Sequence, residues 1–511
     1  MVNTPLQIVP PETVDIIREN FPIILVTVGL YVVGFLLTSH FARKKSTGDL
    51  VDFSVASRTL GWVVVTFTLV ASVSSGVGMA GFPGTVYTVG AGFITSVILG
   101  FCLASILIWY LGRRIWILGN EYGFSTPGEL LGEYYQSDTV RLYTVFISVV
   151  FSVAYIVAQF TAGGILIFVL SGGLLSVEIG ILLITGIVSL HVIFTGVRGI
   201  AWFDTFNGAV QIIAFIAFSA GIILHAGGLQ ELFVRISETN PDLLTIPGPV
   251  GAYPPTNVYG TGIGLLVGLS LMAPAAWFRF YGSNKKENFA SIAIGLLVLF
   301  LIIDMSLLLM GLYGKIIFPD IANPDFVSSF LAFEILPIPI AVLFLVGILA
   351  AIVSTSDSYM HAFSVTFGKD FVRAILVEDM DDDKELNLNY VLILGLAAIA
   401  TSAALFYEGL IVPLAVFAAG FTVQLLPLTF GAVAWPRASN EAAILAPLVG
   451  IPLIFVWELG VVANPLAPMG IRGIFLALII NVAIFVGVSY FTKPVPVKKI
   501  EQFHGLLHER L

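Results

Sequence analysis

Long apolar runs separated by short polar stretches dominate this chain. We count thirteen of them, near residues 20–40, 60–88, 90–111, 142–171, 177–196, 201–226, 259–281, 289–313, 331–365, 388–406, 409–434, 441–462 and 471–491. A helix needs roughly 20 apolar residues to cross a bilayer, and the runs are about that long. They are continuous, unlike the alternating segments of membrane barrels. The pattern predicts an all-α polytopic membrane protein with thirteen transmembrane helices.

Two of the runs are expected to be broken at membrane depth, because they carry helix breakers. The second contains "SSGVGMAGFPG" (74–84), with four glycines and a proline, and the run at 409–434 contains "VPLAVFAAGFTVQLLP". Non-helical backbone inside a membrane is tolerated where protein or a watery cavity surrounds it, and interrupted helices mark the binding sites of transporters. A glycine-rich packing face is the alternative. Since Pro83 also removes a backbone donor, we expect a break at 74–84.

Composition agrees with a membrane protein and excludes a soluble one. The chain is 58% hydrophobic and 11% charged, with a mean hydropathy of +1.00. A soluble domain of this length could not bury so much apolar surface. The single cysteine, Cys102, lies in the third run, so an intramolecular disulfide is impossible. We expect no cleaved signal peptide, because the first run lacks a basic start and a cleavage site.

The distribution of basic residues predicts the orientation. If the N-terminus lies outside, thirteen spans place the C-terminus inside. Nineteen of the 23 Lys and Arg residues then lie on the inner side, and the outer four are Arg18, Arg235, Lys315 and Arg472. Basic residues concentrate on the cytoplasmic side of membrane proteins. We therefore expect a multi-pass cell-membrane protein with its N-terminus outside and its C-terminus in the cytoplasm.

Candidate chemistry concentrates in "AAIVSTSDSYMHAFS" (350–364), the polar half of the ninth run. Ala351, Ser354 and Thr355 stand at i, i+3 and i+4, so they share one helical face. Neutral oxygens on such a face suit an alkali cation. The alternative is that the hydroxyls bond back to their own helix carbonyls, as is common in membrane helices. The residues alone leave both interpretations open.

An enzymatic reading of this stretch fails on geometry. The set that comes nearest to a Ser–His–Asp catalytic triad is Ser354 or Ser358 with Asp357 and His361. All of these residues lie on one helix, so their side chains cannot surround a substrate. We also find no phosphate-binding loop, zinc spacing or basic nucleic-acid stripe. We therefore expect neither an enzyme nor a nucleic-acid-binding protein.

Several motifs, in order along residues 50 to 437, resemble the sodium/solute symporter family of sodium-coupled proline, pantothenate, monocarboxylate and sugar carriers. They are "DFSVASRTLGW", "LVASVSSGVGMAGFPGTVYTVG", "STPGELLGEYY", "VFSVAYIVAQFTAGG", "GIAWFDTFNGAVQ", "WFRFYGSNKKENFA", "AAIVSTSDSYM" and "QLLPLTFGAVAWP". The resemblance implies a LeuT-like core of two inverted five-helix repeats with discontinuous helices. The implied organisation is an extracellular N-terminus and leading helix (1–48), a ten-helix core (49–437), and two further helices with a short cytoplasmic tail (438–511).

The resemblance also implies a sodium site between the broken helix and the hydroxyl-rich helix. Its ligands would be the carbonyls of Ala71, Ser74 and Ala351 and the hydroxyls of Ser354 and Thr355. Sodium would be co-transported, and no organic cofactor is implied.

A second cation site, or a path by which sodium leaves, would use Asp204, Asp357 and Ser358. Buried acids in membranes are costly and usually functional. Two alternatives stay open. Asp357 could carry a proton, or the acids could form salt bridges, for example Asp357 with His361 or either acid with a cytoplasmic arginine.

Departures from the family pattern bear on the substrate. Val73 stands where proline-type members carry an acid, and Pro274-Ala275 replaces the usual Pro-Gln or Pro-His. The cavity is therefore expected to be small and rather apolar. Its expected polar, aromatic and close-approach positions are Gly78, Gln159, Trp277, Asp304 and Gln424.

The resulting hypothesis is sodium-coupled symport, into the cell and by alternating access, of a small organic solute: an amino acid such as proline, or a short monocarboxylate. The expected partners are that solute and the lipid membrane, with the monomer as the functional unit. The alternatives are a transporter-like membrane sensor and a carrier coupled to protons instead of sodium.

Overall fold

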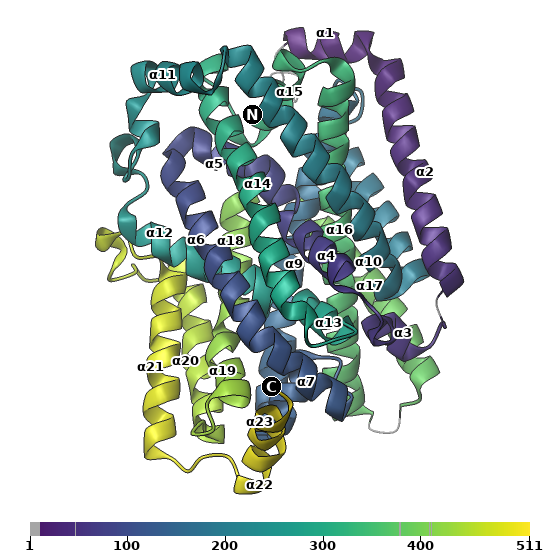
Figure 1. The fold of residues 1–511 in the computed structure, drawn as a ribbon, viewed down its shortest axis with the longest axis vertical. Helices are drawn as coiled ribbons and strands as arrows, with labels where there is room; N and C mark the ends of the chain where they lie inside the picture. The colour runs from purple at the N-terminus through teal and green to yellow at the C-terminus, as the bar shows by residue number, and fades with distance from the viewer. Residues whose placement is uncertain (1–10, 46, 378–379, 408, 410) are drawn as a thin grey trace.

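The protein is all-helical. The computed structural model describes residues 11–45, 47–377, 380–407, 409 and 411–511 (Figure 1). Its first helices are α1 (Pro11–Glu19), α2 (Phe21–Lys45), α3 (Leu50–Val55), α4 (Trp62–Ser74), α5 (Phe82–Val89), α6 (Ala91–Leu107), α7 (Arg113–Tyr122), α8 (Pro127–Tyr135), α9 (Asp138–Leu170), α10 (Val177–Ala226), α11 (Leu229–Thr239) and α12 (Pro255–Thr261). Then follow α13 (Pro274–Gly282), α14 (Asn288–Ile317), α15 (Val327–Ile335), α16 (Ile338–Thr366), α17 (Asp382–Ala404), α18 (Ile411–Thr422), α19 (Leu426–Ala434), α20 (Asn440–Glu458), α21 (Gly473–Phe491), α22 (Val497–Ile500) and α23 (Leu506–Arg510).

Short 3-10 and π-helical segments connect or extend these helices. Those that matter below are η3 (Val77–Gly81), η7 (Gly262–Met272), η8 (Pro324–Phe326), η9 (Phe367–Leu376) and η10 (Val423–Leu425). The long loop predicted near 227–258 contains short helices, as expected: α11 and two 3-10 turns, Pro241–Leu244 and Pro249–Gly251.

The helices give fewer membrane spans than the sequence pattern predicts. Within the described residues, ten helices are long and apolar enough to cross a membrane, or eleven when the bent pair α4 and η3–α5 is taken as one span. The remaining predicted spans fall on the two halves of α10 and on the interrupted stretch α12–η7–α13. The count of thirteen therefore stays a prediction.

The break predicted at 74–84 is present. Helix α4 ends at Ser74, Ser75 adopts φ 45° and ψ 163°, and the chain resumes as a helix with a bend of 54°. Because an α-helix leaves its last four carbonyls without partners, the carbonyls of residues 71–74 are free to bind other donors or a cation.

A second break occurs where the sequence analysis did not place it. Ala273 is extended (φ −60°, ψ 137°) between η7 and α13. The residue before a proline is driven out of the helical region, and Pro274 follows here. The break expected in the run 409–434 is wrong. That run is one 24-residue span, Ile411–Ala434, in which η10 only tightens the helix for one turn.

Helix α10 is too long to be one span. Fifty residues rising 1.5 Å each would reach about 75 Å, more than twice the apolar thickness of a bilayer. The helix divides at Gly196, which has φ 56° and ψ −169°. The residues on either side match the two runs predicted there, 177–196 and 201–226.

Gly196→Ala is expected to lower the free energy of unfolding by about 1–3 kcal/mol, because a side chain at positive φ is strained. Its Cβ would also lie 2.8 Å from the Phe53 ring. Thermal unfolding of the purified protein in detergent measures this. Gly186→Ala is the matched control, since it lies in the same helix with nothing within 4 Å of its added Cβ. If both variants unfold at the same temperature, the strain at Gly196 is unimportant.

The central helices are enclosed by the others. The α9 and α16 spans are mostly buried, whereas α2 is largely exposed at the edge of the bundle (Figure 1). Helices α1 and α11 lie at one end of the molecule, and α22 and α23 lie at the opposite end. The broken helix α4–η3–α5 and the hydroxyl-rich helix α16 therefore meet inside the protein.

Candidate sodium and substrate site

The end of α4 meets α16 at the predicted sodium ligands. The Thr355 hydroxyl of α16 lies 3.0 Å from the carbonyl oxygen of Ser72 and 3.4 Å from that of Ala71. Both carbonyls belong to the last turn of α4, where no further helical N–H reaches them. The structure therefore brings Ala71 and Thr355 together, as the sequence analysis expected.

The other predicted ligands lie on the same two helices, within a turn of this contact. Ser354 precedes Thr355 and donates a hydrogen bond to Asp204 of α10. The Ser74 hydroxyl bonds back to the Val70 carbonyl at 2.7 Å, so only its backbone carbonyl is available to an ion. Ala351 is buried one turn before Thr355 on α16. The Thr355 hydroxyl and the carbonyl oxygens at the end of α4 thus face each other, and uncharged oxygens of this kind suit sodium.

A buried ion pair lies beside these residues. Arg279 of α13 is 3.2 Å from the Asp204 carboxylate, and both side chains are almost fully buried. The Arg279 guanidinium also donates to Thr68 at 2.9 Å, to Ser72 at 2.7 Å, and to Ser358. Thr68 in turn donates to Asp204. This network joins α4, α10, α13 and α16 in one polar cluster.

Asp204 and Ser358, predicted to act together, both belong to this cluster, but Asp357 does not. Its carboxylate pairs with His191 of α10. The alternative in which Asp357 pairs with His361 is wrong, because the His361 ring nitrogen contacts the carbonyl of Phe53 at 2.8 Å. Residues 357 and 358 are about 100° apart around a helix, so they face different neighbours.

The broken backbone at residues 75–78 is held by polar groups of α9. The Gly76 N–H donates to Gln159 at 2.8 Å, and the Tyr155 hydroxyl donates to Ser75 at 3.1 Å. The Gly78 N–H donates to the Ser75 hydroxyl at 3.2 Å. Gly78 and Gln159, two of the predicted substrate residues, are therefore neighbours at the break.

The other predicted substrate residues are more scattered. Trp277 is fully buried in α13, one turn after the break at Ala273, and its ring lies 6.1 Å from that of Tyr281. Gln424 accepts a hydrogen bond from Asn481 of α21 at 2.8 Å, so its amide joins α18–α19 to the C-terminal helices. We leave Gln424 out of the substrate site for that reason.

Asp304 lies at the depth of the break but on a separate helix. Helix α14 runs beside α4 and α5, since a Cβ at Gly295 would meet Thr66 and one at Gly311 would meet Pro83. Asp304 follows Gly295 by nine residues, and Ser75 follows Thr66 by nine residues. Because Gly295 lies beside Thr66 and the two helices run in the same direction, Asp304 lies at about the depth of Ser75. Its buried Oδ2 atom has no hydrogen-bond partner among the described residues.

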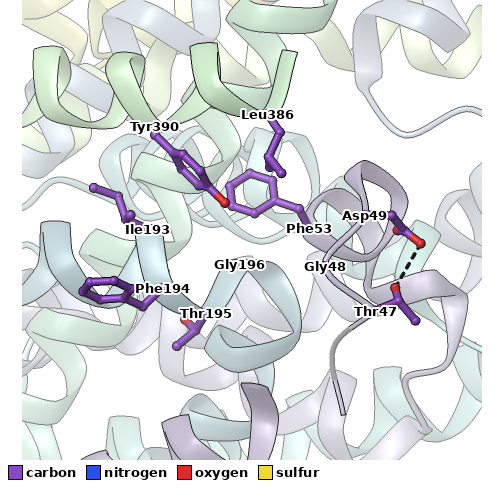
Figure 2. Close-up of a pocket in the computed structure, with 10 residues that line it drawn as sticks. All are labelled: Thr47, Gly48, Asp49, Phe53, Ile193, Phe194, Thr195, Gly196, Leu386 and Tyr390. Atoms are coloured by element: carbon purple, nitrogen blue, oxygen red, sulfur yellow. Dashed lines mark hydrogen bonds between the residues drawn. The ribbon is translucent and has the colours of Figure 1, made fainter. Parts of the chain in front are cut away.

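A cavity of about 440 Å³ opens at the same end as α3. Its lining comes from three stretches, as Figure 2 shows: Thr47, Gly48, Asp49, Phe53, Ile193, Phe194, Thr195, Gly196, Leu386 and Tyr390. It therefore adjoins the division of α10 at Gly196, two turns from Asp204.

Sequence reasoning named only some of the partners that complete the site. It left open a salt bridge of Asp204 with a cytoplasmic arginine, and the structure shows this pair with Arg279. Thr68 and Ser72 precede the glycine-rich break by one or two turns and read as ordinary membrane-helix hydroxyls. His191 had no local signal, because its partner is 166 positions away.

The sequence model of the sodium:solute symporter family matches residues 53–450. This chain belongs to that family. The symporter is 28% identical, over 435 residues, to the sodium/pantothenate symporter of Escherichia coli (strain K12), a match covering 84% of this chain and 89% of that protein. It is 24% identical, also over 435 residues, to the high-affinity proline transporter PutP of Bacillus subtilis (strain 168), covering 83% and 89% of the two chains.

Solved structures share the fold. A sodium-coupled sialic acid symporter in a substrate-bound outward-open state matches with a TM-score of 0.77 at 15% identity, covering 93% of this chain and 98% of that one. Mhp1, a nucleobase-cation-symport-1 family transporter, matches with a TM-score of 0.54 at 14% identity, covering 89% and 98%. The symporter therefore has the LeuT-type fold expected from its motifs.

Family membership settles the class of activity. The symporter is a multi-pass membrane transporter that moves a small solute together with sodium, and it is not an enzyme.

Proposed function

We propose that the symporter imports a small organic solute, either an amino acid such as proline or a short monocarboxylate, by alternating access. Sodium binds the carbonyls of Ala71, Ser74 and Ala351 and the hydroxyls of Ser354 and Thr355. The observation that carries this proposal is the approach of Thr355 to the carbonyls of Ala71 and Ser72 at the end of α4.

Sodium at this position would join two helices that must separate during transport. Helix α4 belongs to the first expected repeat and α16 to the second, so an ion shared between them favours one conformation over the other. A ligand shifts such an equilibrium by the difference in its affinity for the two states. One sodium entering down a potential gains roughly 2.3 kcal/mol per 100 mV, which is available to drive the solute.

The solute would bind at the break beside the ion. Gln159 contacts Gly76 there, two residues before Gly78, and Trp277 and Asp304 are the aromatic and acidic candidates for its walls. Since the α4 break also shapes the sodium site, filling one site orders the other. This is the physical basis that we assign to coupling.

Sodium would then leave past the polar cluster on the inner side. Asp204 and Ser358 are its proposed contacts, and we assign Asp357 to its pair with His191. The cavity of Figure 2 lies beyond them, next to Gly196, and supplies a route to the cytoplasm.

We propose an outside N-terminus and an inside C-terminus. The arrangement of Figure 1 supports this orientation, because Arg18 and Arg235 lie on α1 and α11 at one end, while α22 and α23 lie at the other. We also propose that the chain divides into a leading helix (1–48), a ten-helix core (49–437) and two further helices with a tail (438–511). The proposed functional unit is the monomer.

Uptake into proteoliposomes tests the function. Labelled L-proline, D-pantothenate and lactate are offered separately with sodium outside, with potassium replacing sodium in the control. We expect uptake of one of them to depend on inward sodium and to increase with an inside-negative potential. Counterflow of the labelled solute without a gradient distinguishes a carrier from a sensor. Sodium-independent uptake would contradict the proposal.

A further inference from the structure

A second cavity, on the side of the molecule that we propose faces outward, is not used by the mechanism above. Its volume is about 270 Å³, which is enough for a solute of the size of proline. It lies between the outer half of the broken helix, the loop before α12, and the starts of α18 and α21. Its lining includes Gly84, Phe93, Tyr253, Asp325, Val412 and Arg472.

The cavity adjoins the broken helix directly. A Cβ at Gly84 of α5 would lie 2.7 Å from the backbone of Pro324, so α5 packs against η8 with no side chain between them. A Cβ at Gly81 would lie 3.8 Å from the Asp325 carboxylate. Asp325 is therefore held next to η3, three residues from Gly78 at the proposed solute site.

Asp325 is a buried acid without a counter-ion in the part of the chain that the structure describes. It is 5% exposed, and its side chain accepts one hydrogen bond within the described residues, from the Ile411 N–H at 3.4 Å. Burial raises the pKa of this carboxyl, and the Ile411 N–H is the opposing contact among the described residues. A buried carboxylate without a partner is costly, so an arriving ammonium group would be stabilised there.

The opposite charge comes from Arg472, the residue before α21. Its guanidinium is one-third exposed and contacts Glu458 through one nitrogen at 3.3 Å. The loop before α21 is tied to the start of α12 by a hydrogen bond from Thr256 to the Met469 carbonyl at 2.6 Å. Arginine can bind a carboxylate through its remaining N–H groups.

Aromatic rings form one wall of this cavity. The Phe93 ring meets those of Phe82 and Tyr253 edge to face, with centroids 5.0 Å and 6.0 Å apart. The Tyr253 hydroxyl accepts a hydrogen bond from Ser96 at 2.8 Å. The lining thus combines one acid and one base with aromatic and apolar side chains and a few neutral polar ones, including Asn257.

We infer that this cavity is an outer loading site for a small zwitterion, which binds its ammonium at Asp325 and its carboxylate at Arg472 before passing to the break. The inference rests on the proposed function and narrows it, because a solute carrying only a carboxylate would leave Asp325 unpaired. Specificity then comes from matching both charges at once.

Uptake kinetics of labelled L-proline in proteoliposomes test the loading site, with Asp325→Asn and Arg472→Gln as variants. Each is expected to raise KM at least about tenfold, the size expected for one hydrogen bond to a charged group. The kcat should stay within about twofold, because the loading site acts on capture and not on later steps.

Two controls separate this effect from damage to the fold. Asp320→Asn removes an exposed acid from the same loop, and Glu458→Gln removes the ion pair of Arg472 while leaving its guanidinium. Both should keep the wild-type KM. Competition gives a second readout: pyrrolidine should lose its inhibition in Asp325→Asn only, and D-pantothenate in Arg472→Gln only.

The outcomes are distinguishable from failure of sodium coupling. Wild-type KM in both variants, or equal loss of both inhibitors in each variant, overturns the loading site. Wild-type protein that neither takes up nor binds L-proline overturns the zwitterion assignment. Sodium-driven uptake of D-pantothenate would in that case leave the proposed symport intact.

Discussion

Replacing Ser354 and Thr355 together by alanine should raise the sodium concentration for half-maximal uptake roughly thirtyfold or more. Each lost hydroxyl removes a ligand worth about 1–1.5 kcal/mol, and 1.4 kcal/mol corresponds to a factor of ten. The protein should still insert and fold, because alanine fits a helix well and neither side chain is large. The measurement is sodium-dependent uptake in proteoliposomes, together with the thermal stabilisation that sodium gives in detergent.

Ser356→Ala is the matched control for that double variant. Ser356 is as buried as its neighbours, but its hydroxyl donates to the carbonyl of Ile352 in its own helix, at 2.7 Å. The sodium concentration that gives half-maximal uptake by the Ser356→Ala variant should stay within about twofold of the wild-type value. If the double variant keeps the wild-type sodium dependence, the ion does not bind between α4 and α16.

Asp204→Asn is expected to destabilise the folded symporter by about 3–5 kcal/mol, the cost of leaving one member of a buried ion pair without its partner. Arg279 would keep its charge, with Thr68, Ser72 and Ser358 as its remaining neutral neighbours. Thermal unfolding of the purified protein measures the loss. Arg279→Gln should have a similar effect for the same reason.

The double variant Asp204→Asn with Arg279→Gln should be more stable than the sum of its two single changes, since neither charge is then left unpaired. Glu231→Gln provides the comparison, because it breaks the exposed pair of Glu231 with Arg235 on α11. Exposed pairs contribute about 0–1 kcal/mol. If Asp204→Asn unfolds at the wild-type temperature, the cluster does not hold the helices together.

The buried acids Asp204 and Asp325 differ in whether the protein supplies a counter-ion, and we assign them different roles for that reason. Asp204 already has a counter-ion in Arg279, whereas Asp325 has none among the described residues. A buried acid that the protein neutralises internally holds helices together. A buried acid beside a cavity that the protein leaves without a counter-ion is instead suited to a ligand.

The contrast between the two predicted breaks shows what local patterns can and cannot specify. At 74–84 four glycines and Pro83 agree, and the helix is broken there. At 409–434 the prolines and glycine suggested the same outcome, yet the helix continues through η10. At 273–274 one proline sufficed, because Ala273 can adopt the extended conformation that the residue before proline prefers.

The sequence by itself determined the class of fold, the presence of the first broken helix, and the face that carries Ala351, Ser354 and Thr355. These are set by hydrophobic length, by backbone freedom and by helical periodicity, all of which act over a few turns. Only the tertiary structure decided the partners: Thr355 with the end of α4, Asp204 with Arg279, and Asp357 with His191 instead of His361. Such pairings depend on how helices far apart in sequence pack and rotate against one another, and the spacing of residues within one helix carries no information about that.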